Sequence, residues 1–406
     1  LTTVTSDSNE LASYNYDQVG NLTRTDYGNG TFEGNSYDNL NRVTSISLNN
    51  SSGEFYKKQL ELDNVGLIIG GSTTVNSSVV KDDDYSYTSV QRLENVTDTL
   101  TSTTKSYQFN SSSNLTTSPW GTNTVSANGQ LTTSTNQNNT VTYAHDNRGN
   151  RTNKTVTNTL TPNVTESIDY QWSVDDKLNA FEKTVTEVSG STTEEIKASV
   201  DYDYDANGLL ISRQASTSSI NYVDGIPSMG GTSTSPEEKF VWDTLSSVPS
   251  LLEDRTENFV YGNGSTPFVQ VDKATGDIEY LHSDERGSII AASVENGNYS
   301  WYKTYDEYGY QSNKVAQSGV DQISTRFAYA GEYQDATTGL YNLRARWYEP
   351  ETASFLTVDP ALGMTGEAYS YASANPLNYT DPLGLWSVNN GWWYSIACLL
   401  YTSDAA

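Results

Sequence analysis

Aromatic and polar positions alternate along much of the chain, and turn residues interrupt the alternation at short intervals. Residues 14–17 read Tyr-Asn-Tyr-Asp, so two aromatic side chains stand two positions apart. In a β-strand this spacing puts both side chains on one face. Gly20-Asn21 follows as a turn signal, and Leu22-Thr23 then opens a returning strand. The pattern predicts a β-hairpin.

The same unit recurs through the first half of the chain: an aromatic residue, an acid, a short polar run and then Leu-Thr or an equivalent. Clear copies lie at residues 16–23 and 37–44. A lone hairpin is marginal in water, so we expect the units to stack edge to edge into an extended, curved sheet. Weaker copies lie at residues 62–63, 87, 109–116, 128–131, 145–150, 172–178 and 204–209.

The composition also favours an all-β fold. Hydrophobic residues make up only 35% of the 406 residues, and 29 Tyr and 8 Trp supply much of the apolar surface that a core needs. The Ser, Thr, Asn and Gly between the aromatics favour strands and turns over long helices. The regular aromatic spacing and the low proline content, 10 residues, argue against a disordered polar chain.

The net charge of −27 argues against nucleic acid and anionic membranes as partners, because an acidic surface repels both. One Cys and two His, at His145 and His282, are too few for a typical zinc site and leave little for Ser-His-Asp or Cys-His catalysis. We therefore expect no metal and no cofactor. If the chain catalyses a reaction, carboxylates are the expected agents.

The two ends of the chain carry little targeting information. No apolar run reaches the length of a membrane span, and no charged-then-apolar signal segment opens the sequence. The first residue is Leu1 rather than Met. We interpret the chain as a segment of a longer protein.

The segment from residue 327 to 385 is more specific than the repeats. It contains two Asp-Pro turns, at 359–360 and 381–382, with arginines at 344 and 346 upstream. Two neighbouring carboxylates do not both ionise readily, so such a pair can offer an acid and a base for amide hydrolysis. The alternative is structural, because Asp-Pro-Leu-Gly is also a sound β-turn, with Asp first, Pro second and Gly fourth.

The repeats resemble the YD repeats of the RHS (rearrangement hot spot) family, and residues 284–288, Asp-Glu-Arg-Gly-Ser, are similar to its D-x-x-G-S variant. The C-terminal segment resembles the RHS repeat-associated core of polymorphic toxins and of Tc toxin C components. Two departures are Glu349, where the family has Asp, and residues 351–354, which lack the customary Gly-Arg. The matching pieces are residues 331–335, 338–341, 344–348, 355–360, 371, 375–376 and 378–385.

The resemblance covers nearly the whole chain and implies a hollow β-shell that encloses its own C-terminal part. It divides the chain into a repeat sheet at 1–280, a core or plug domain with an autoprotease at 281–385, and a truncated variable tail at 386–406. The ending 398–406 is similar to translated sequencing-adapter DNA, in which case Cys398 is not native. We expect the chain to form part of a shell wall rather than a closed shell.

Matched residue by residue, the resemblance implies that Asp359 and Asp381 are two catalytic aspartates and that Arg346 is an associated arginine. The bond to be cut is Leu385-Trp386. Arg346 would hold the ionised aspartate or polarise the scissile carbonyl. The supporting turn residues are Pro360, Pro382 and Gly384.

The choice between the two arginines stays open. Arg344 lies two positions before Arg346, which would place it on the same strand face, so either arginine is a candidate partner for a carboxylate. Several other polar residues are interpreted as structural. His145 and His282 stand at repeat positions and are interpreted as structural. Residues 82–84, Asp-Asp-Asp, are expected to form a solvated loop, because the spaced ligands of a calcium loop are missing.

The leading hypothesis is an encapsulating β-shell whose single-turnover aspartic autoprotease acts on its own chain and releases a C-terminal toxin or effector that is missing here. Its expected partners are that toxin domain and a secretion-system or toxin-complex component, and its expected place is the outside or surface of a bacterium. The alternative is a non-catalytic cell-surface or wall-associated YD-repeat protein that binds carbohydrate or a neighbouring cell through Tyr and Trp. A plain β-solenoid or propeller scaffold is the third reading.

Overall fold

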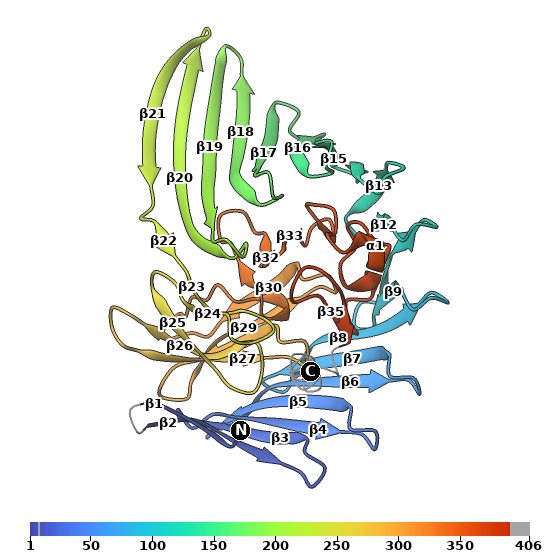
Figure 1. Ribbon diagram of the computed structural model, residues 1–406, viewed down its shortest axis with the longest axis vertical. Helices are drawn as coiled ribbons and strands as arrows, with labels where there is room; N and C mark the ends of the chain where they lie inside the picture. The colour runs from blue at the N-terminus through green and yellow to red at the C-terminus, as the bar shows by residue number, and fades with distance from the viewer. Residues whose placement is uncertain (7–8, 390–406) are drawn as a thin grey trace, which may run out of the picture.

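The computed structural model describes residues 1–6 and 9–389, which form an all-β protein of antiparallel meanders (Figure 1). The predicted fold class is therefore confirmed. Nearly every strand pairs with the strands that precede and follow it in sequence, as expected for stacked hairpins. Residues 390–406, which include Cys398 and the adapter-like ending, lie outside the described residues.

Three sheets, joined end to end along the chain, form a wall. The first consists of β1 (Thr3–Ser6), β2 (Asn9–Tyr16), β3 (Leu22–Tyr27), β4 (Phe32–Tyr37), β5 (Val43–Asn50), β6 (Gly53–Leu62), β7 (Ile68–Val75), β8 (Ser78–Tyr87), β9 (Leu93–Asp98) and β10 (Thr103–Ser106).

The second and third wall sheets follow the same up-and-down order. The second consists of β11 (Gln108–Phe109), β12 (Leu115–Ser118), β13 (Gly121–Val125), β14 (Leu131–Thr135), β15 (Asn139–His145), β16 (Arg151–Asn158), β17 (Val164–Trp172), β18 (Leu178–Ser189), β19 (Thr192–Tyr204), β20 (Leu210–Val223), β21 (Ile226–Thr234) and β22 (Glu238–Lys239), the last pairing with β20. The third consists of β23 (Val241–Asp243), β24 (Ser250–Glu253), β25 (Glu257–Tyr261), β26 (Pro267–Asp272), β27 (Ile278–Ser283), β28 (Ile289–Ser293), β29 (Tyr299–Tyr305) and β30 (Gln311–Ala316).

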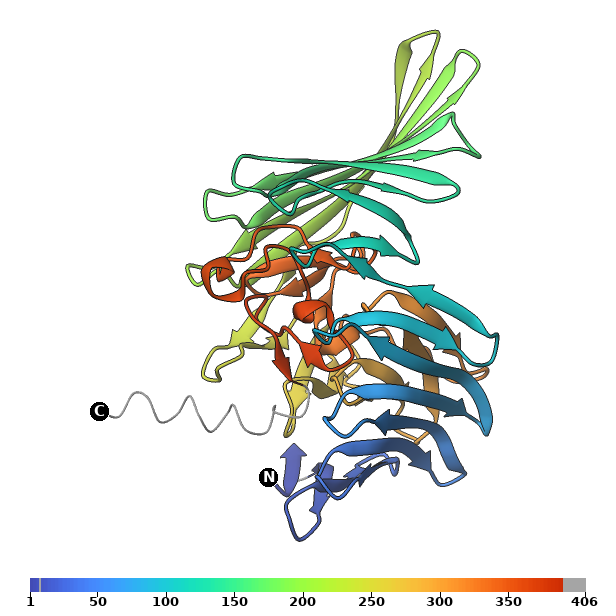
Figure 2. The ribbon, with the colours of Figure 1, turned by 90° about the vertical axis from the view of Figure 1, so that its right-hand side faces the viewer.

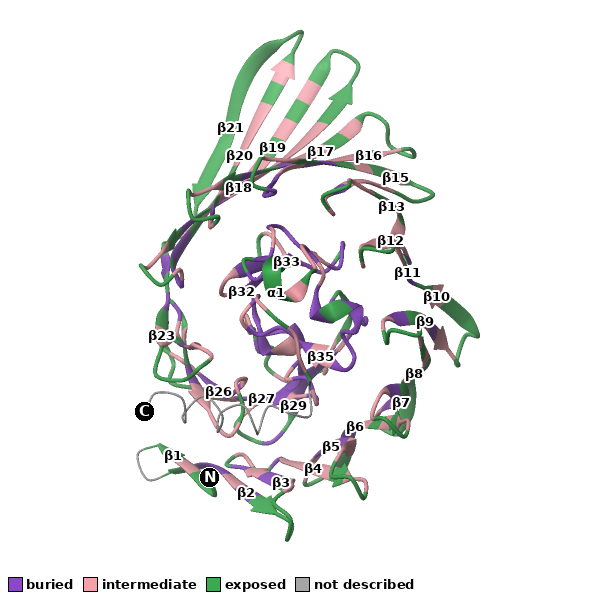
Figure 3. Ribbon diagram, turned by 45° about the vertical axis from the view of Figure 1, so that its right-hand side comes forward, coloured by how far each residue is buried: buried purple, intermediate pink, exposed green. Residues whose placement is uncertain are grey.

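The C-terminal segment forms small elements of its own, and we call residues 327–389 the plug. Its pieces are η1 (Tyr329–Gly331), β31 (Tyr333–Gln334), β32 (Tyr341–Leu343), β33 (Arg346–Glu349), β34 (Ser354–Phe355), α1 (Leu362–Thr365), η2 (Ala372–Ala374), β35 (Tyr379–Thr380) and β36 (Val388–Asn389). Figure 2 shows the wall sheets winding past the plug, and Figure 3 shows wall strands on several sides of β32, β33 and β35.

The aspartate of the repeat is a turn device. The carboxylate of Asp17 accepts hydrogen bonds from the backbone N–H groups of Val19 and Asn21, at 3.0 and 2.8 Å, and Gly20 N–H donates to the Asp17 carbonyl. Gly20 has a φ of 96°, which a glycine adopts without strain. The same pair of bonds, to the N–H groups two and four residues later, recurs at Asp38, Asp63, Asp146, Asp205, Asp284 and Asp306.

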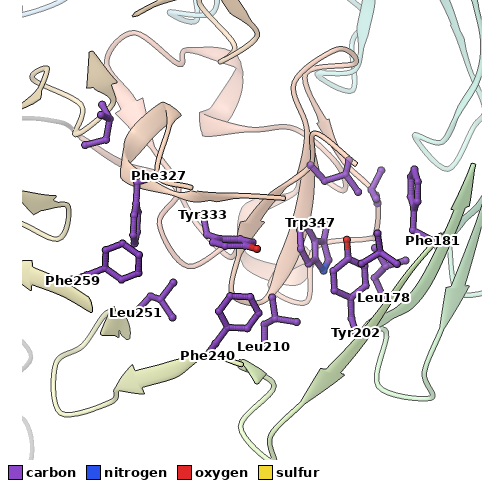
Figure 4. Packing of buried hydrophobic residues seen from close by; sticks show 14 of the residues in the cluster. Leu178, Phe181, Tyr202, Leu210, Phe240, Leu251, Phe259, Phe327, Tyr333 and Trp347 are labelled. Atoms are coloured by element: carbon purple, nitrogen blue, oxygen red, sulfur yellow. The ribbon is translucent and has the colours of Figure 1, made fainter. Parts of the chain in front are cut away.

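Aromatic side chains join the wall to the plug. In the largest buried cluster, Tyr202 of β19 lies 5.0 Å from the plug residue Trp347, measured between ring centroids, and Phe240 lies 5.2 Å from Tyr333 (Figure 4). Each aromatic side chain can bury about 150–250 Å², so such pairs add much apolar burial to the Leu, Ile and Val side chains of the same cluster.

Buried ion pairs add to this seam between wall and plug. Glu349, which departs from the family pattern, accepts hydrogen bonds from Arg151 and Lys154 of β16 at 2.5 and 2.8 Å. Asp335 pairs in the same way with Arg213 of β20 at 2.8 Å. Removing one partner from such a pair leaves a buried charge, so these contacts strongly favour one seating of the plug.

Two sequence expectations about the wall differ from the structure. The expected boundary at residue 280 falls inside β27, and the third wall sheet continues to Ala316, because Asp284 opens one more hairpin turn of the wall rather than a new domain. Residues 82–84 lie in β8 and not in a loop. Strand alternation buries Asp83, and Lys81 compensates its charge at 3.1 Å.

Candidate active site

The hairpin between β32 and β33 places the two arginines differently. Arg344 lies in the turn with a φ of 61°, whereas Arg346 is the first residue of β33 and pairs with Leu343. The two are therefore not on one strand face, because the left-handed turn residue redirects the chain between them. The Arg346 guanidinium packs over the ring of Phe355, 3.6 Å from its centroid, and the residue is only 2% exposed.

Arg346 brings the two candidate aspartates together. Its Nη2 lies 3.3 Å from Oδ2 of Asp359 and 3.3 Å from Oδ2 of Asp381. Asp359 is 5% exposed and Asp381 is 3% exposed. The three residues that the sequence singled out thus form one buried constellation, although Asp359 and Asp381 are 22 positions apart in the sequence.

A short turn fixes Asp359. Its Oδ1 accepts the backbone N–H of Ala361 at 2.7 Å, and its Oδ2 accepts the Thr365 hydroxyl at 3.3 Å. The Asp359 carbonyl accepts the N–H of Leu362 at 3.0 Å, which closes the turn around the exposed Pro360. Both carboxylate oxygens of Asp359 therefore have defined directions.

The turn at Asp381 brings its carboxylate to the expected scissile bond. Oδ1 accepts the N–H of Leu385 at 2.9 Å and the N–H of Trp386 at 3.1 Å. Gly384 N–H donates to the Asp381 carbonyl, so residues 381–384 form the β-turn anticipated from Asp-Pro-Leu-Gly, with Pro382 buried at its second position.

Gly384 is required where it stands. Its φ is 66°, and a Cβ there would lie 2.7 Å from the Leu343 carbonyl oxygen and 3.1 Å from the Arg346 nitrogen. A larger residue would push the turn off the β32–β33 hairpin. The close approach also lets Arg346 Nε donate to the Gly384 carbonyl, one residue before the carbonyl of Leu385.

Burial sets the protonation of the site. It raises the pKa of Asp381 to about 6, against the lowering effect of Arg346 and of the N–H groups of Leu385 and Trp386, and nearby Asp359 adds to the rise. Burial also lowers the pKa of Arg346, although the two aspartates oppose it. Asp381 is thus a carboxyl that can carry a proton in mildly acidic solution.

Sequence reasoning gave no role to Glu332, which lies beside this site. Arg344 Nη1 contacts Glu332 Oε2 at 2.5 Å and the Pro382 carbonyl at 2.6 Å. Burial raises the pKa of Glu332 to about 7, opposed by Arg344 and supported by Asp381. Arg344 therefore serves Glu332 and the turn, and Arg346 alone of the two arginines contacts the aspartates in the described residues. Glu332 stood within a matched motif, but its partner in the hairpin turn was not visible from spacing.

The histidines lie elsewhere. His282 is fully buried, with Nε2 2.8 Å from the Ser293 hydroxyl, and His145 lies beside the Tyr369 ring. Residues 1–6 and 9–389 contain no group of three or more His, Cys, Asp or Glu side chains that could hold a metal ion. Within that same part of the chain, no helix is long and apolar enough to cross a membrane.

The fold and site define a class: an all-β chain of stacked YD-type hairpins that surrounds its own C-terminal plug, with a buried Asp-Arg-Asp constellation next to a chain turn. No family model matches the chain. It is similar to the tRNA3(Ser)-specific nuclease WapA of Bacillus spizizenii, with 26% identity over 389 residues, covering 94% of this chain and 15% of that protein. It is also similar to the toxin protein Tse5 of Pseudomonas aeruginosa, with 33% identity over 110 residues, covering 27% of this chain and 8% of that protein.

These relatives confirm the resemblance to RHS-type polymorphic toxins. The chain spans about 15% of the length of the WapA relative. Among solved structures, the crystal structure of TcdB2-TccC3 is similar at 16% identity and a TM-score of 0.43, covering 92% of this chain and 22% of that chain.

Proposed function

We propose that this chain is the shell-and-plug portion of an RHS-type toxin and that it cuts its own backbone between Leu385 and Trp386, freeing the segment that follows. The observation that carries the proposal is the 3.1 Å hydrogen bond from the Trp386 N–H to Asp381 Oδ1, because this nitrogen is the leaving group of the proposed reaction. The 3.3 Å contacts of Arg346 with both aspartates support it.

In the proposed reaction, a water molecule attacks the Leu385 carbonyl carbon while Asp359 accepts a proton from that water. Protonated Asp381 donates a proton to the Trp386 nitrogen as the C–N bond breaks. The products are a carboxylate at Leu385 and an amine at Trp386. A general acid works best when its pKa lies near the pH of the reaction. Asp381 is suited to the acid role in mildly acidic solution because burial raises its pKa to about 6.

Arg346 holds the two carboxyl groups close together while they take different protonation states. A buried cation between them stabilises the ionised Asp359 while Asp381 keeps its proton. Because the scissile bond belongs to the same chain as both aspartates, the reaction needs no substrate binding step and one turnover is enough. No further enzymatic activity is proposed for this chain.

The test is to extend the chain beyond Ala406 by a reporter domain and to look for two fragments on a denaturing gel. We expect cleavage after Leu385 in the wild type and none in Asp359→Asn or Asp381→Asn. Asp17→Asn, a matched change in a wall turn, should cleave like the wild type. A well-folded wild-type chain that stays intact would remove the basis of the proposal.

The partners and place that follow are a downstream toxin or effector segment, a toxin-complex or secretion component, and a bacterial secreted or surface location. Similarity to the Tse5 toxin supports this reading. The aromatic distribution weighs against the alternative of a carbohydrate-binding surface, because Tyr16, Tyr310 and Trp386 are the exposed aromatic side chains within the described residues. The others pack into the wall or against the plug.

A further inference from the structure

Three consecutive backbone carbonyls that precede the expected scissile bond are bound in register by three consecutive residues of the β32–β33 turn. The donors are Arg344 Nη1, the Ala345 backbone N–H and Arg346 Nε, and the acceptors are the carbonyls of Pro382, Leu383 and Gly384, in that order. Residues 344–346 therefore bind residues 382–384 much as a protease binds the residues before a cut site. We call residues 344–346 the binding turn.

The binding turn is itself held by the wall. Lys177, in the turn between β17 and β18, donates from Nζ to the carbonyls of Arg344 and Ala345 at 3.2 and 3.3 Å. From the other side, Arg344 Nε donates to the Pro249 carbonyl at 2.9 Å, just before β24. Lys177 belongs to the second wall sheet and Pro249 adjoins the third, so two wall sheets converge on the binding turn.

The environment of Lys177 is built for this contact. Its stem passes over Gly208 of the next hairpin, where a Cβ would lie only 2.6 Å from Lys177 Cε. Within the described residues, no carboxylate lies within ion-pair distance of its Nζ, although the wall is strongly acidic. Burial lowers the pKa of Lys177, opposed by Asp205 and Asp175. A half-buried ammonium that gives its hydrogen bonds to two plug carbonyls stabilises the plug's position rather than the wall's own fold.

We propose that Lys177 is a positioning residue for self-cleavage, and this inference rests on the proposed function. By holding the carbonyls of Arg344 and Ala345, it fixes the binding turn, and the binding turn fixes the chain before the Leu385-Trp386 bond. Cleavage then depends on the plug being seated against the second wall sheet. The wall hairpin at residues 172–178 thereby makes the geometry of the site depend on the plug being enclosed by the wall.

The experiment measures the self-cleavage rate of the full chain, with the downstream reporter, in Lys177→Met. Methionine keeps much of the stem over Gly208 but cannot donate. Since the variant removes two hydrogen bonds from a charged donor, we expect cleavage to slow by about tenfold or more. Lys197→Met is the matched control, because Lys197 pairs with Glu182 on the wall at 2.9 Å and should leave the rate unchanged.

Three further readouts separate positioning from general damage. Lys177→Arg, which retains charged N–H donors, should recover at least part of the lost rate. The pH at which the Lys177→Met rate is half-maximal should match the wild type, because the aspartates and Arg346 are untouched. The thermal unfolding temperature of Lys177→Met should stay close to that of Lys197→Met.

If the Lys177→Met chain cleaves at the same rate as the wild type, the inference is overturned and the proposed function still stands. A slow Lys177→Met chain that also unfolds at a much lower temperature, with no recovery in Lys177→Arg, would assign Lys177 to the wall and overturn it as well. If the folded wild type does not cleave at all, the proposed function fails together with the inference.

Discussion

Asp17 in the wall and Asp381 in the plug each open a turn of the same kind. In both, the N–H of a glycine three residues later donates to the aspartate carbonyl, and the carboxylate accepts the N–H four residues later, at 2.8 Å in the wall and 2.9 Å in the plug. The wall turn lies in solvent, whereas the plug turn is buried against Arg346. The same type of turn therefore places one carboxyl group in solvent and the other in a buried site beside a cation.

The surroundings push the two pKa values in opposite directions. Desolvation acts to raise the pKa of Asp17, but hydrogen bonds from Asn21 and Val19 outweigh it and lower the pKa. In the plug, burial outweighs the same type of hydrogen bond and raises the pKa of Asp381 to about 6. The same kind of turn therefore carries a carboxyl group of low pKa when it is exposed, and one of raised pKa when it is buried next to a second carboxylate.

The largest expected difference between the two turns is in self-cleavage. Asp381→Asn keeps the oxygen that accepts the Leu385 and Trp386 N–H groups but removes the acid, so the rate should fall by about 10²–10⁴-fold. Asp17→Asn keeps the same kind of turn in the wall and should leave the rate unchanged. Fragment yield over time on a denaturing gel measures both. Equal rates in the two variants would mean that Asp381 is only a turn residue.

The second difference concerns the cations that pair with aspartates in the two regions. In the uncleaved Asp359→Asn background, and well above pH 6, where Asp381 is ionised, Arg346→Met should lower the free energy of unfolding by about 3 kcal/mol, because it leaves a buried carboxylate without its cation. Arg24→Met removes a pair that is 45% and 39% exposed on its two sides, and it should cost less than about 1 kcal/mol. Denaturant unfolding compares the two. A similar small loss in both would show that Asp381 is not ionised in the folded chain at that pH.

The third difference is the sign of the pH dependence. Since the pKa of Asp381 in the folded chain lies above its ordinary value of 3.8, the folded chain binds more protons and gains stability as pH falls from above about 6 toward about 4. Relative to Asp381→Asn, both in the Asp359→Asn background, the unfolding free energy should rise by up to about 3 kcal/mol over that range; the background removes the small part of the pKa rise that Asp359 contributes. For Asp17, whose pKa is lowered, the contribution runs the other way and is lost in acid. A flat difference curve for Asp381 would contradict its raised pKa.

The smallest expected difference is between the two turn glycines. Both have a positive φ, so alanine costs about 1–2 kcal/mol of backbone strain at either position. At Gly20 a Cβ meets nothing within 4 Å, whereas at Gly384 it would lie 2.7 Å from the Leu343 carbonyl oxygen. Gly384→Ala should therefore lower the unfolding temperature more than Gly20→Ala, and it should also slow cleavage by moving the turn. Equal temperatures would show that the plug turn is not packed against the hairpin.

Much of the wall could be predicted from sequence because each hairpin is encoded locally. An aromatic, an aspartate and a glycine or asparagine at fixed offsets specify the turn, as at Asp17 and Asp205, and strand alternation then selects the buried face. Asp83 shows where local reasoning ends. A run of three aspartates favours a solvated loop, but the middle one, Asp83, is buried in β8. Lys81, two residues earlier on the same strand, pairs with Asp83 and also with the distant Glu307, which the local sequence does not reveal.

The site was predicted in part for the same reason. Asp359, Asp381 and Arg346 stand in a recognisable motif, and the turns around the two aspartates follow from their prolines and Gly384. Their approach to one atom of Arg346 depends on how the plug folds. The contact of Lys177 with the carbonyls of residues 344 and 345 joins positions 167 and 168 residues apart, and no local pattern encodes such a distance.

The most direct measurement is the mass of both fragments after the folded wild-type chain is incubated in heavy-oxygen water near pH 6, beside Asp381→Asn. We expect one fragment to end at Leu385 with a single heavy oxygen in its new carboxylate and the other to begin at Trp386, with neither fragment in Asp381→Asn. Fragments with other ends, cleavage that survives in Asp381→Asn, or a wild-type chain that remains whole would contradict the account.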